Sequence, residues 1–258
     1  MGAAPGLQVF SADLHVHTCL SPCATLDMTP MKIVREAQAR GLAIIAITDH
    51  NSAENTGAVM KAAADLDLFV IPGMEITTQE EAHIVALFGK EQDALSMQEL
   101  IYGKLMPGEN DEDLFGIQVI ANELDEVEGI NNRLLIGATV LGMEAVVAEI
   151  HARQGLAVAA HINRQSYSII SQLGFIPPDL PIDALEISAV PQFDRSEAQS
   201  GAYGKGPFIT GSDAHSLEQI GESRVYLKLE RPDMHELKQA LRGQEGRQVM
   251  EEPITGVR

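Results

Sequence analysis

The sequence predicts an α/β fold in which strands alternate with helices, built either as an open parallel sheet or as a closed barrel. Short apolar, β-branched segments alternate with segments whose apolar residues recur at helical spacing, in the first hundred residues and again after residue 138. The 258 residues are 45% hydrophobic and 21% charged, which is typical of a globular protein with a buried core. No repeat of fixed period is present, and we expect one domain over residues 1–258.

The N-terminal elements follow from capping residues and apolar runs. Residues 9–16 are typical of a short strand. Thr29 can cap a helix whose first position is Pro30, where the missing N–H of proline costs nothing, and Gly41 ends that helix. Residues 42–48 form a continuous apolar run, which indicates a strand buried on both faces.

The remaining elements continue the alternation. Helices are expected around residues 58–66 and 143–153. Further strands are expected at residues 69–72, 83–88, 156–160, 183–188 and 207–211. Because helices separate most of these strands, the order favours parallel strands with helical crossovers.

Residues 90–133 fit this alternation poorly. They contain the turn-forming pair Pro107-Gly108 and show no clear strand. Eight acidic residues and no basic one lie between Leu105 and Asn132. We expect an insert within the barrel, which forms either a lid or a plain surface excursion with a solvated acidic face.

The net charge of −19 disfavours long nucleic acids and membrane surfaces as partners, because phosphate backbones and anionic lipids would be repelled. The charge does not exclude a nucleotide substrate, since bound divalent ions would make the electrostatic potential at the site positive. The first ten residues lack the features of a signal peptide, and no run reaches the roughly 20 apolar residues that span a bilayer. The two cysteines, Cys19 and Cys23, do not suggest a disulfide framework. We therefore expect a soluble, cytoplasmic protein.

The positions of the histidines point to the function. Six of the eight lie at an end of an apolar, strand-like run: His15, His17, His50, His83, His161 and His215. The carboxyl ends of parallel strands share one face of an α/β fold, so side chains that follow different strands converge there. His83 is an exception, because it begins its run. Four carboxylates occupy similar positions: Asp13, Asp49, Glu75 and Asp213.

These residue types suit a divalent metal ion, which binds imidazole nitrogens and carboxylate oxygens. His15 and His17 are two residues apart on an extended strand, so both side chains point to one face and can bind one ion. Glu75 follows a turn at the end of a strand and could bridge two ions. His151 and His235 stand on helix-like segments, where we expect them at the surface. The sequence has no GxSxG or GxxxxGK[ST] motif, and neither cysteine is placed as a Cys–His nucleophile pair.

Five separated motifs carry a resemblance to a known family. DLHVHTCLSPC, ITDHN, PGMEIT, AAHI and GSDAH follow one another in the order and spacing of the PHP family, named for its polymerase and histidinol-phosphatase members. The resemblance covers most of the chain and is weakest over residues 90–133. It implies a distorted (β/α)7 barrel whose C-terminal mouth holds two or three divalent ions of zinc, manganese or iron.

The resemblance also implies a set of metal ligands. The first ion would be bound by His15, His17, Glu75 and Asp213, the second by Glu75, His83 and His161, and the third by His50, His215 and a residue from the loop after the HVH motif. In that loop Cys23 stands where similar members of the family can have histidine. A thiolate can bind zinc or iron, so Cys23 is either a ligand or a sign that the third site is weak or empty. Ile162 is a second departure, because the family often has proline there.

The family implies a metal-dependent phosphoesterase in which a metal-bound hydroxide attacks the phosphate ester, and no side chain is assigned as the catalytic group. Arg164 and Arg195 are candidates for binding the phosphate. The expected substrate is a small phosphomonoester, a nucleotide or a short oligonucleotide.

Two alternatives stay open. A metal-dependent amidohydrolase also opens with an HxH motif on a β/α barrel, and its metals are commonly bridged by a carboxylated lysine at a strand end. Lys90 is the only lysine that closes a strand-like run, and polar residues follow it at once. A non-catalytic metal-binding regulatory module would be expected to lose ligands that this chain keeps.

Overall fold

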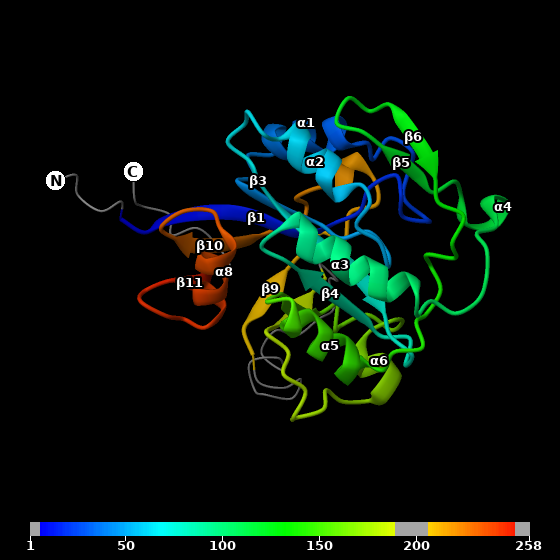
Figure 1. The fold of residues 1–258 in the computed structure, drawn as a ribbon. Helices are drawn as coiled ribbons and strands as arrows, with labels where there is room; N and C mark the ends of the chain where they lie inside the picture. The colour runs from blue at the N-terminus through cyan, green and yellow to red at the C-terminus, as the bar shows by residue number, and fades with distance from the viewer. Residues whose placement is uncertain (1–5, 189–205, 251–258) are drawn as a thin grey trace.

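The computed structural model describes residues 6–188 and 206–250, and its centre is a nine-stranded sheet that curls into a nearly closed barrel (Figure 1). The strand order is β11-β10-β1-β2-β3-β4-β7-β8-β9. The strands are β1 (Gln8–Val16), β2 (Ile44–Ile47), β3 (Phe69–Thr77), β4 (His83–Leu87), β7 (Leu156–Ala159), β8 (Ala184–Ile187), β9 (Phe208–Thr210), β10 (Val225–Leu229) and β11 (Gln248–Met250).

The β9 end of the sheet closes onto β1 at the mouth of the barrel, which leaves β10 and β11 outside the closure. The segment after β9 returns to the end of β1, where Val16 and Ala214 form a parallel bridge. The amide of His17 donates to the carbonyl of Ala214 at 3.0 Å. The α/β barrel expected from the sequence is confirmed.

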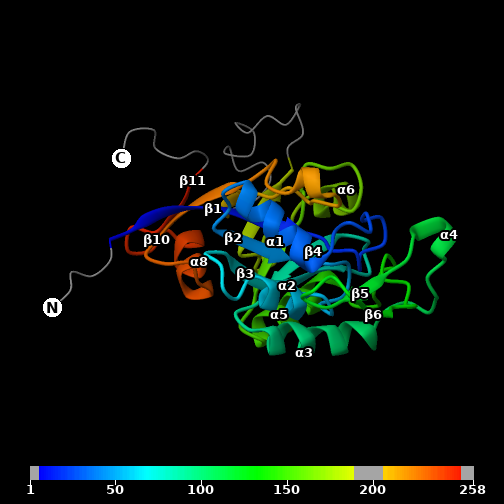
Figure 2. The same cartoon turned by 90° about the horizontal axis from the view of Figure 1, so that it is seen from above.

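Helices cover the outside of the barrel (Figures 1 and 2). They are α1 (Pro30–Ala39), α2 (Thr56–Ala62), α3 (Glu91–Tyr102), α5 (Met143–Ala152) and α6 (Ile169–Leu173). In α1 the expected apolar stripe is buried, with Ile33, Val34 and Ala37 inside, and Pro30 occupies the first turn as predicted.

Strand β4 runs opposite to the direction that the sequence pattern favoured. It pairs antiparallel with both β3 and β7, in a register that sets His83 against Thr77 and Ile84 against Ala159. The first residue of β4 therefore lies at the edge where its two neighbours end. This reversal explains why His83, which begins its strand, belongs to the same end of the barrel as the histidines that follow other strands.

Alternate strand residues pack on opposite sides of the sheet. Val85 packs inside the barrel with Val158, whereas Ile84 and Ala86 pack outside in the cluster that contains α3 and α5. Directly opposed residues on neighbouring strands point to the same face. Because Glu75 is opposite Val85, its carboxylate is directed to the inner side of the barrel.

The acidic insert is only partly irregular. Its first part is helix α3, which buries Ala94, Met97 and Ile101 against the barrel and so belongs to the helical layer. The rest contains the short helix α4 (Glu112–Phe115) and a two-stranded hairpin of β5 (Val119–Ala121) and β6 (Val127–Ile130). The expectation of a segment without strands was wrong. The sequence pattern missed these strands because they pair only with each other and contain no buried apolar run.

A unit near the C-terminus, which the sequence pattern did not predict, lies at the opposite end of the molecule from the hairpin (Figures 1 and 2). It consists of β10, the helix α8 (Met234–Leu241) and β11, and β10 pairs antiparallel with β1. Leu237 and Leu241 of α8 join the inner core. In the described parts of the chain, no helix is long and apolar enough to cross a membrane.

Candidate metal centre

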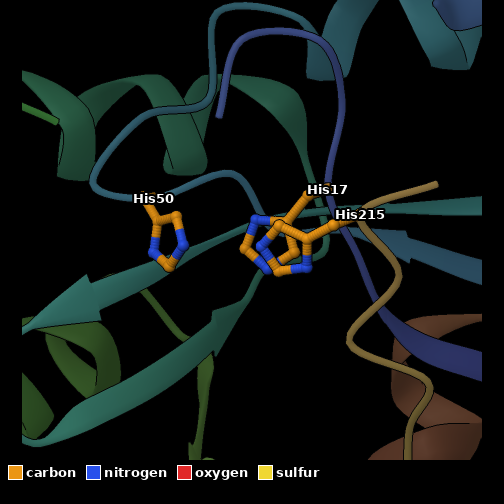
Figure 3. A group of neighbouring side chains, drawn as sticks. All are labelled: His17, His50 and His215. Atoms are coloured by element: carbon orange, nitrogen blue, oxygen red, sulfur yellow. The ribbon is translucent and has the colours of Figure 1, made fainter. Parts of the chain in front are cut away.

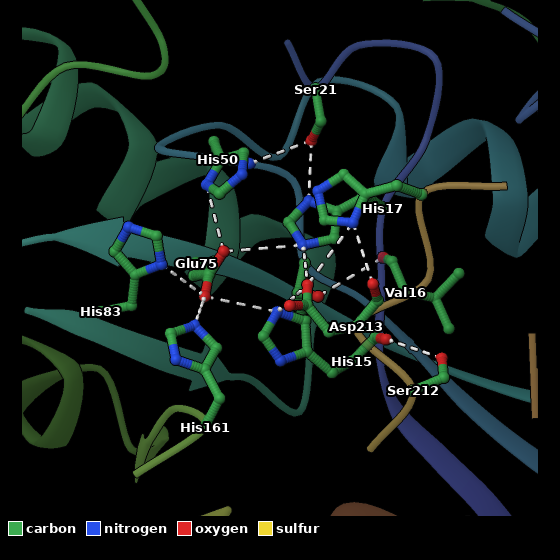
Figure 4. A network of polar contacts seen from close by, with 12 residues as sticks. His15, Val16, His17, Ser21, His50, Glu75, His83, His161, Ser212 and Asp213 are labelled. Atoms are coloured by element: carbon green, nitrogen blue, oxygen red, sulfur yellow. Dashed lines mark hydrogen bonds and ion pairs between the residues drawn. The ribbon is translucent and has the colours of Figure 1, made fainter. Parts of the chain in front are cut away.

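The predicted metal ligands gather at one end of the barrel (Figure 4). They come from the end of β1, the loop after β2, the end of β3, the start of β4 and the segments after β7 and β9. Seven of them are at most 6% exposed: His15, His17, His50, Glu75, His83, His161 and Asp213. His215 is half-buried.

The carboxylate of Glu75 lies at the centre of this cluster. Its Oε1 atom is 2.8 Å from Nδ1 of His83 and 3.1 Å from Nε2 of His161. Its Oε2 atom is 3.0 Å from Nδ1 of His50 and 3.5 Å from Nε2 of His17. One buried carboxylate with imidazoles around both oxygens is placed to bridge two cations.

The donor atoms suit a metal ion because one of them is otherwise unexplained. Nε2 of His15 is buried and has no hydrogen-bond partner. It lies 3.4 Å from Oε1 of Glu75 and 3.4 Å from Oδ1 of Asp213. A buried polar atom without a partner is unfavourable, and a cation between this nitrogen and the two carboxylates would remove the penalty. The residues therefore fit the divalent ion that the sequence pattern predicts.

Three groups of side chains have donor atoms within 4.8 Å of one another: His15, His17, Glu75 and Asp213; His50, Glu75 and His83; and His17, His50 and His215 (Figure 3). The first has the composition expected for the first ion. The second contains His50 where the sequence predicted His161, although His161 also contacts Glu75. In the third, His17 accompanies the expected His50 and His215.

Cys23, which is exposed, lies at the edge of the third group. Its Sγ atom is 3.9 Å from Nε2 of His50. Burial opposes ionisation of the thiol, but contacts with His215 and His50 outweigh it and lower the pKa of Cys23 to about 7. The resemblance had placed Cys23 with His50 and His215, and the structure brings Cys23 beside His50 although the two residues are 27 positions apart.

The electrostatics of the cluster favour cations. Burial alone would raise the pKa of Glu75 and Asp213, but nearby imidazoles, above all His83 for Glu75 and His15 for Asp213, hold both pKa values well below their usual range. Burial and neighbouring histidines also hold the pKa of His17 well below its usual range. Burial opposes protonation of His15 and His50, but Glu186 and Glu75 raise the pKa of His15 well above its usual range and that of His50 to about 10. The ionised carboxylates and the neutral His17 suit a divalent ion, whereas His15 and His50 must release a proton to bind one.

A family model described as PHP domain matches residues 13–167, which is more than half of the chain. This chain belongs to the PHP domain family. A second model, described as PHP-associated, matches residues 202–245, a range that includes Asp213, His215, β10 and α8.

Solved structures resemble this PHP chain at low sequence identity. Endonuclease Q from Pyrococcus furiosus, a lesion-specific endonuclease, has a TM-score of 0.68 and 17% identity over 94% of this chain and 58% of that one. Endonuclease Q has also been solved with a 27-mer duplex substrate that carries an abasic lesion at the active site. A protein described as a metal-dependent phosphoesterase from Bifidobacterium adolescentis has a TM-score of 0.58 and 18% identity over 95% of this chain and 98% of its own.

An amidohydrolase from Chromobacterium violaceum has a TM-score of 0.53 and 18% identity, covering 82% of this chain and 90% of that one. The PHP chain thus spans about 58% of the length of the first endonuclease, and the likenesses show a shared fold. Comparison with curated protein sequences gives no match.

Two histidines of the PHP site have partners on the side away from Glu75. Nδ1 of His15 lies 2.8 Å from Oε2 of Glu186, a buried residue of β8. Nδ1 of His17 lies 2.9 Å from Oγ of Ser21, which donates to Asp49 at 2.6 Å. Such outer partners orient imidazole ligands and increase their basicity. Sequence reasoning missed Glu186 and Ser21, although a single glutamate within the apolar run of β8 was a signal.

The backbone of the site is strained at several non-glycine residues. Cys23, Asn51, His161, Tyr167 and Asp213 have positive φ angles of 77°, 51°, 29°, 57° and 52°. Left-handed backbone is unfavourable for such residues and persists where the surrounding structure holds it, often at functional sites.

Close packing also requires a glycine beside the site. A Cβ atom at Gly211 would lie 2.9 Å from Cβ of His15, closer than real Cβ contacts allow. The bare backbone at this position lets the segment that carries Asp213 approach β1.

The mouth of the site is a cavity of about 210 Å³ lined by charged, aromatic and apolar side chains. Arg164 lines it and forms an ion pair with Asp213, and its side chain is 39% exposed. Ile136, from the segment after β6, and Tyr167 also line the cavity. The Tyr167 ring stacks on His83, with ring centroids 4.7 Å apart.

The other predicted residues lie away from the cavity or outside the described residues. His151 contacts Asp183 at 2.8 Å at a distance from the cluster, and His235 is on α8, so neither joins the described ligand groups. Arg195 falls outside the described residues, and its predicted role stays a prediction.

Proposed function

We propose that this PHP chain is a metal-dependent hydrolase that cleaves a phosphate ester, with a small phosphomonoester, a nucleotide or a short oligonucleotide as substrate. The observation that carries the proposal is the buried Glu75 carboxylate with imidazoles around both oxygens, opening into a cavity with Arg164 at its rim. The PHP family supplies the fold of a metal-dependent phosphoesterase.

The ligands we assign to the metal ions are His15, His17, His50, Glu75, His83, His161, Asp213 and His215. Zinc, manganese or iron would suit this mixture of imidazole and carboxylate. When bound, such ions lower the pKa of water and stabilise the oxygens of an in-line displacement at phosphorus. The protein keeps the ligand nitrogens free for this role by fixing the opposite nitrogens of His15 and His17 with Glu186 and Ser21.

Arg164 is the residue we assign to the phosphate. Its guanidinium lies at the mouth, already beside the carboxylate of Asp213, so a phosphate oxygen bound at the cluster would be within its reach. A planar guanidinium can bind two phosphate oxygens at once. Ile136 and Tyr167 would contact the organic part of the substrate, and the volume of about 210 Å³ favours a small one.

The amidohydrolase alternative finds less support. One structural relative is an amidohydrolase. Lys90, however, follows the end of β4, and because β4 is antiparallel this end lies at the edge where β7 begins, away from the mouth. Among the described residues, the lining of the cavity includes no lysine that could be carboxylated.

The endonuclease relative brings a second candidate, cleavage of a DNA duplex at a lesion. A net charge of −19 and an acidic insert next to the mouth disfavour a long polyanion. A panel of phosphomonoesters, dinucleotides, amides and a duplex with an abasic site separates these activities. Turnover of the amides or of the duplex, with no turnover of the small phosphate esters, would contradict the proposal.

Removing a ligand tests the site itself. We expect His17→Ala and Asp213→Ala to abolish phosphate ester hydrolysis, because each removes a donor from the first group, while circular dichroism shows a retained fold. His235→Ala is the matched control, since it removes an imidazole from α8. Wild-type turnover by either ligand variant, at equal metal content, would show that the chemistry occurs elsewhere.

A further inference from the structure

We infer that a cavity between α5 and α8, at the opposite end of the barrel from the metal centre, is a second ligand site, which binds the phosphoryl oxyanion of free phosphate or of a small phosphorylated molecule. This α5–α8 cavity has a volume of about 300 Å³ and is lined by residues 154–156 and by His151, Asp183, Lys238 and Arg242. None of these lining residues belongs to the described metal-binding groups, so the inference stands apart from the proposed function.

The α5–α8 cavity lies where strands begin, whereas the metal ligands gather where most strands end. Leu156, in its wall, is the first residue of β7, and Asp183 directly precedes β8. The proposed metal ligand His161 follows the other end of β7. The four residues of β7 span roughly 13 Å. A small ligand in this cavity is therefore too far from the metal centre to contact the ions.

The turn between α5 and β7 forms a fixed floor for the cavity. Gln154 has a left-handed φ angle of 57°. A Cβ atom at Gly155 would lie 2.7 Å from Cγ2 of Ile150 and 2.8 Å from Cε1 of Phe88, so packing determines the course of this turn. The carbonyl of Gln154 accepts a hydrogen bond from Nζ of Lys238. This bond holds the ammonium group at the cavity and leaves two of its three N–H donors for a ligand.

His151 and Asp183 form a fixed pair in the wall of the cavity. Nε2 of His151 lies 2.8 Å from Oδ2 of Asp183, and the same oxygen accepts from the amide of Ala157 at 2.9 Å. The amide of Asp183 donates in turn to the carbonyl of Ala157 at 2.8 Å. The carboxylate is thus engaged within the protein and orients the imidazole through Nε2. In the protonated imidazole, Nδ1 can then donate to an anion.

Lys238 and Arg242 bring positive charge to the cavity from the end of α8. Burial lowers the pKa of Lys238, and the nearby Arg242 lowers it further, although Asp183 opposes this. The acidic side chains of the unit of β10, α8 and β11 pair instead with Arg231 or Arg247: Glu230, Asp233, Glu236 and Glu245. An anion bound beside Lys238 and Arg242 would relieve the repulsion between them.

The donors suit a phosphoryl group better than a carboxylate. A guanidinium can bind two phosphate oxygens in parallel, and an ammonium group adds a second positive charge. A phosphoryl group offers three oxygens and up to two negative charges, which match Arg242, Lys238 and His151. Asp183 is the one acidic side chain among the described residues that line the cavity. In a protein with a net charge of −19, this excess of basic groups is a local exception that favours an anion.

Methyl NMR of the full chain loaded with zinc tests the inference, because Leu156 reports on the α5–α8 cavity and Ile136 on the mouth of the metal site. Inorganic phosphate, methylphosphonate and malonate are titrated separately at constant ionic strength. We expect phosphate to shift the Leu156 resonances with a Kd that rises about tenfold in Arg242→Gln and in Lys238→Gln, since each variant loses a charge-assisted hydrogen bond. Arg35→Gln, which removes an exposed cation from α1, should leave this Kd unchanged. The response of Ile136 should be the same in every variant.

Unshifted Leu156 resonances, an unchanged Kd in Arg242→Gln, or tighter binding of malonate than of phosphate would overturn the inference. A response at Ile136 alone would place phosphate at the metal centre, which overturns the second site and leaves the proposed function standing. A loss of stability in Lys238→Gln and Arg242→Gln without a change in binding would also overturn it, because the two cations would then serve only the C-terminal end of the α8 dipole. Tighter binding of phosphate than of methylphosphonate would support the site with free phosphate as its ligand. The reverse order would support it with a phosphorylated small molecule.

Discussion

His15 shows how single residues build this site. Its Nδ1 atom is held by Glu186 at 2.8 Å, and its Nε2 atom faces Glu75 and Asp213 at 3.4 Å each. Glu186 is 1% exposed, and one of its carboxylate oxygens, Oε1, has no hydrogen-bond partner. Burying a carboxylate with one unpaired oxygen is unfavourable. The role of Glu186 that would explain it is to fix the tautomer of His15 and leave Nε2 free for a metal ion.

Glu186→Gln tests this use. The substitution keeps the volume and removes the charge, so we expect metal affinity to fall by about 10- to 100-fold, the range typical of outer partners of metal ligands. Competition titration with a chromophoric chelator measures the affinity. Glu99→Gln on the exposed side of α3 is the control. Wild-type affinity in Glu186→Gln would mean that the carboxylate does not orient His15.

The sequence could indicate the ligands of this site better than their outer partners. The histidines and carboxylates were visible because each lies at an end of an apolar run. Glu186 is 171 positions from His15, and no local spacing joins the two. Ser21 is four positions from His17, but its other partner, Asp49, is 28 positions away and comes beside it only when β1 and β2 pair. Such partners depend on the fold, so a pattern along the chain does not contain them.

Among the elements, β4 is the one whose direction decides the site. Only residues 78–82 separate the end of β3 from the start of β4. Parallel neighbours need a crossover of a dozen or more residues, so this short connection already required an antiparallel pair. The alternation of strands and helices elsewhere concealed the exception. Because β4 is antiparallel to its neighbours, its first residue, His83, lies at the mouth of the barrel with the other histidines.

The segment that follows the insert contributes Ile136 to the wall of the cavity, and Asn51 holds this segment. Asn51 is fully buried, and its Nδ2 atom donates to the carbonyls of Leu135 and Gly137, at 2.8 Å each. Its Oδ1 atom accepts from the amide of Thr77 at 3.1 Å. Ile136, between the two carbonyls, lines the cavity. The residue after a proposed ligand thus connects the barrel to the segment over its mouth.

Asn51→Ala should loosen that segment. Three buried backbone groups would lose their partner, and we expect the free energy of unfolding to fall by about 1–3 kcal/mol. We also expect KM to rise more than kcat falls, because Ile136 would no longer be held against the substrate. Chemical denaturation and steady-state kinetics measure the two effects. Asn132→Ala, an exposed position in the same segment, should change neither. Unchanged stability in Asn51→Ala would show that other contacts hold the segment that carries Ile136.

Over the whole molecule, the fold confines several buried ionisable groups to one end of the barrel and leaves a strongly acidic surface elsewhere. The α/β class was predictable because alternating elements recur along most of the chain, and the resemblance to the PHP family implied the barrel. The unit of β10, α8 and β11 was not, since its strands pair through β1, which is more than 200 positions earlier in the sequence. The inner core that α8 completes lies beneath the cluster of ligands, so metal binding and the stability of the domain are connected.

Removal of metal should therefore destabilise the entire domain. A ligand that binds only the folded state at about 1,000 times its dissociation constant stabilises it by about 4 kcal/mol. For a chain of this size, each kcal/mol corresponds to roughly 2–4 °C in melting temperature, so we expect chelation to lower Tm by roughly 10 °C. Readdition of zinc or manganese should restore Tm.

The size of this shift should depend on pH. Imidazole must lose its proton to bind a metal, so protons compete with the ion, and the shift should shrink as the pH falls below neutrality. Differential scanning calorimetry with and without chelator, from pH 5 to pH 8, measures it. His17→Ala should show a smaller shift than the wild type at every pH, and His235→Ala the same shift. A chelator effect of equal size in His17→Ala and the wild type would place the stabilising ion outside this cluster.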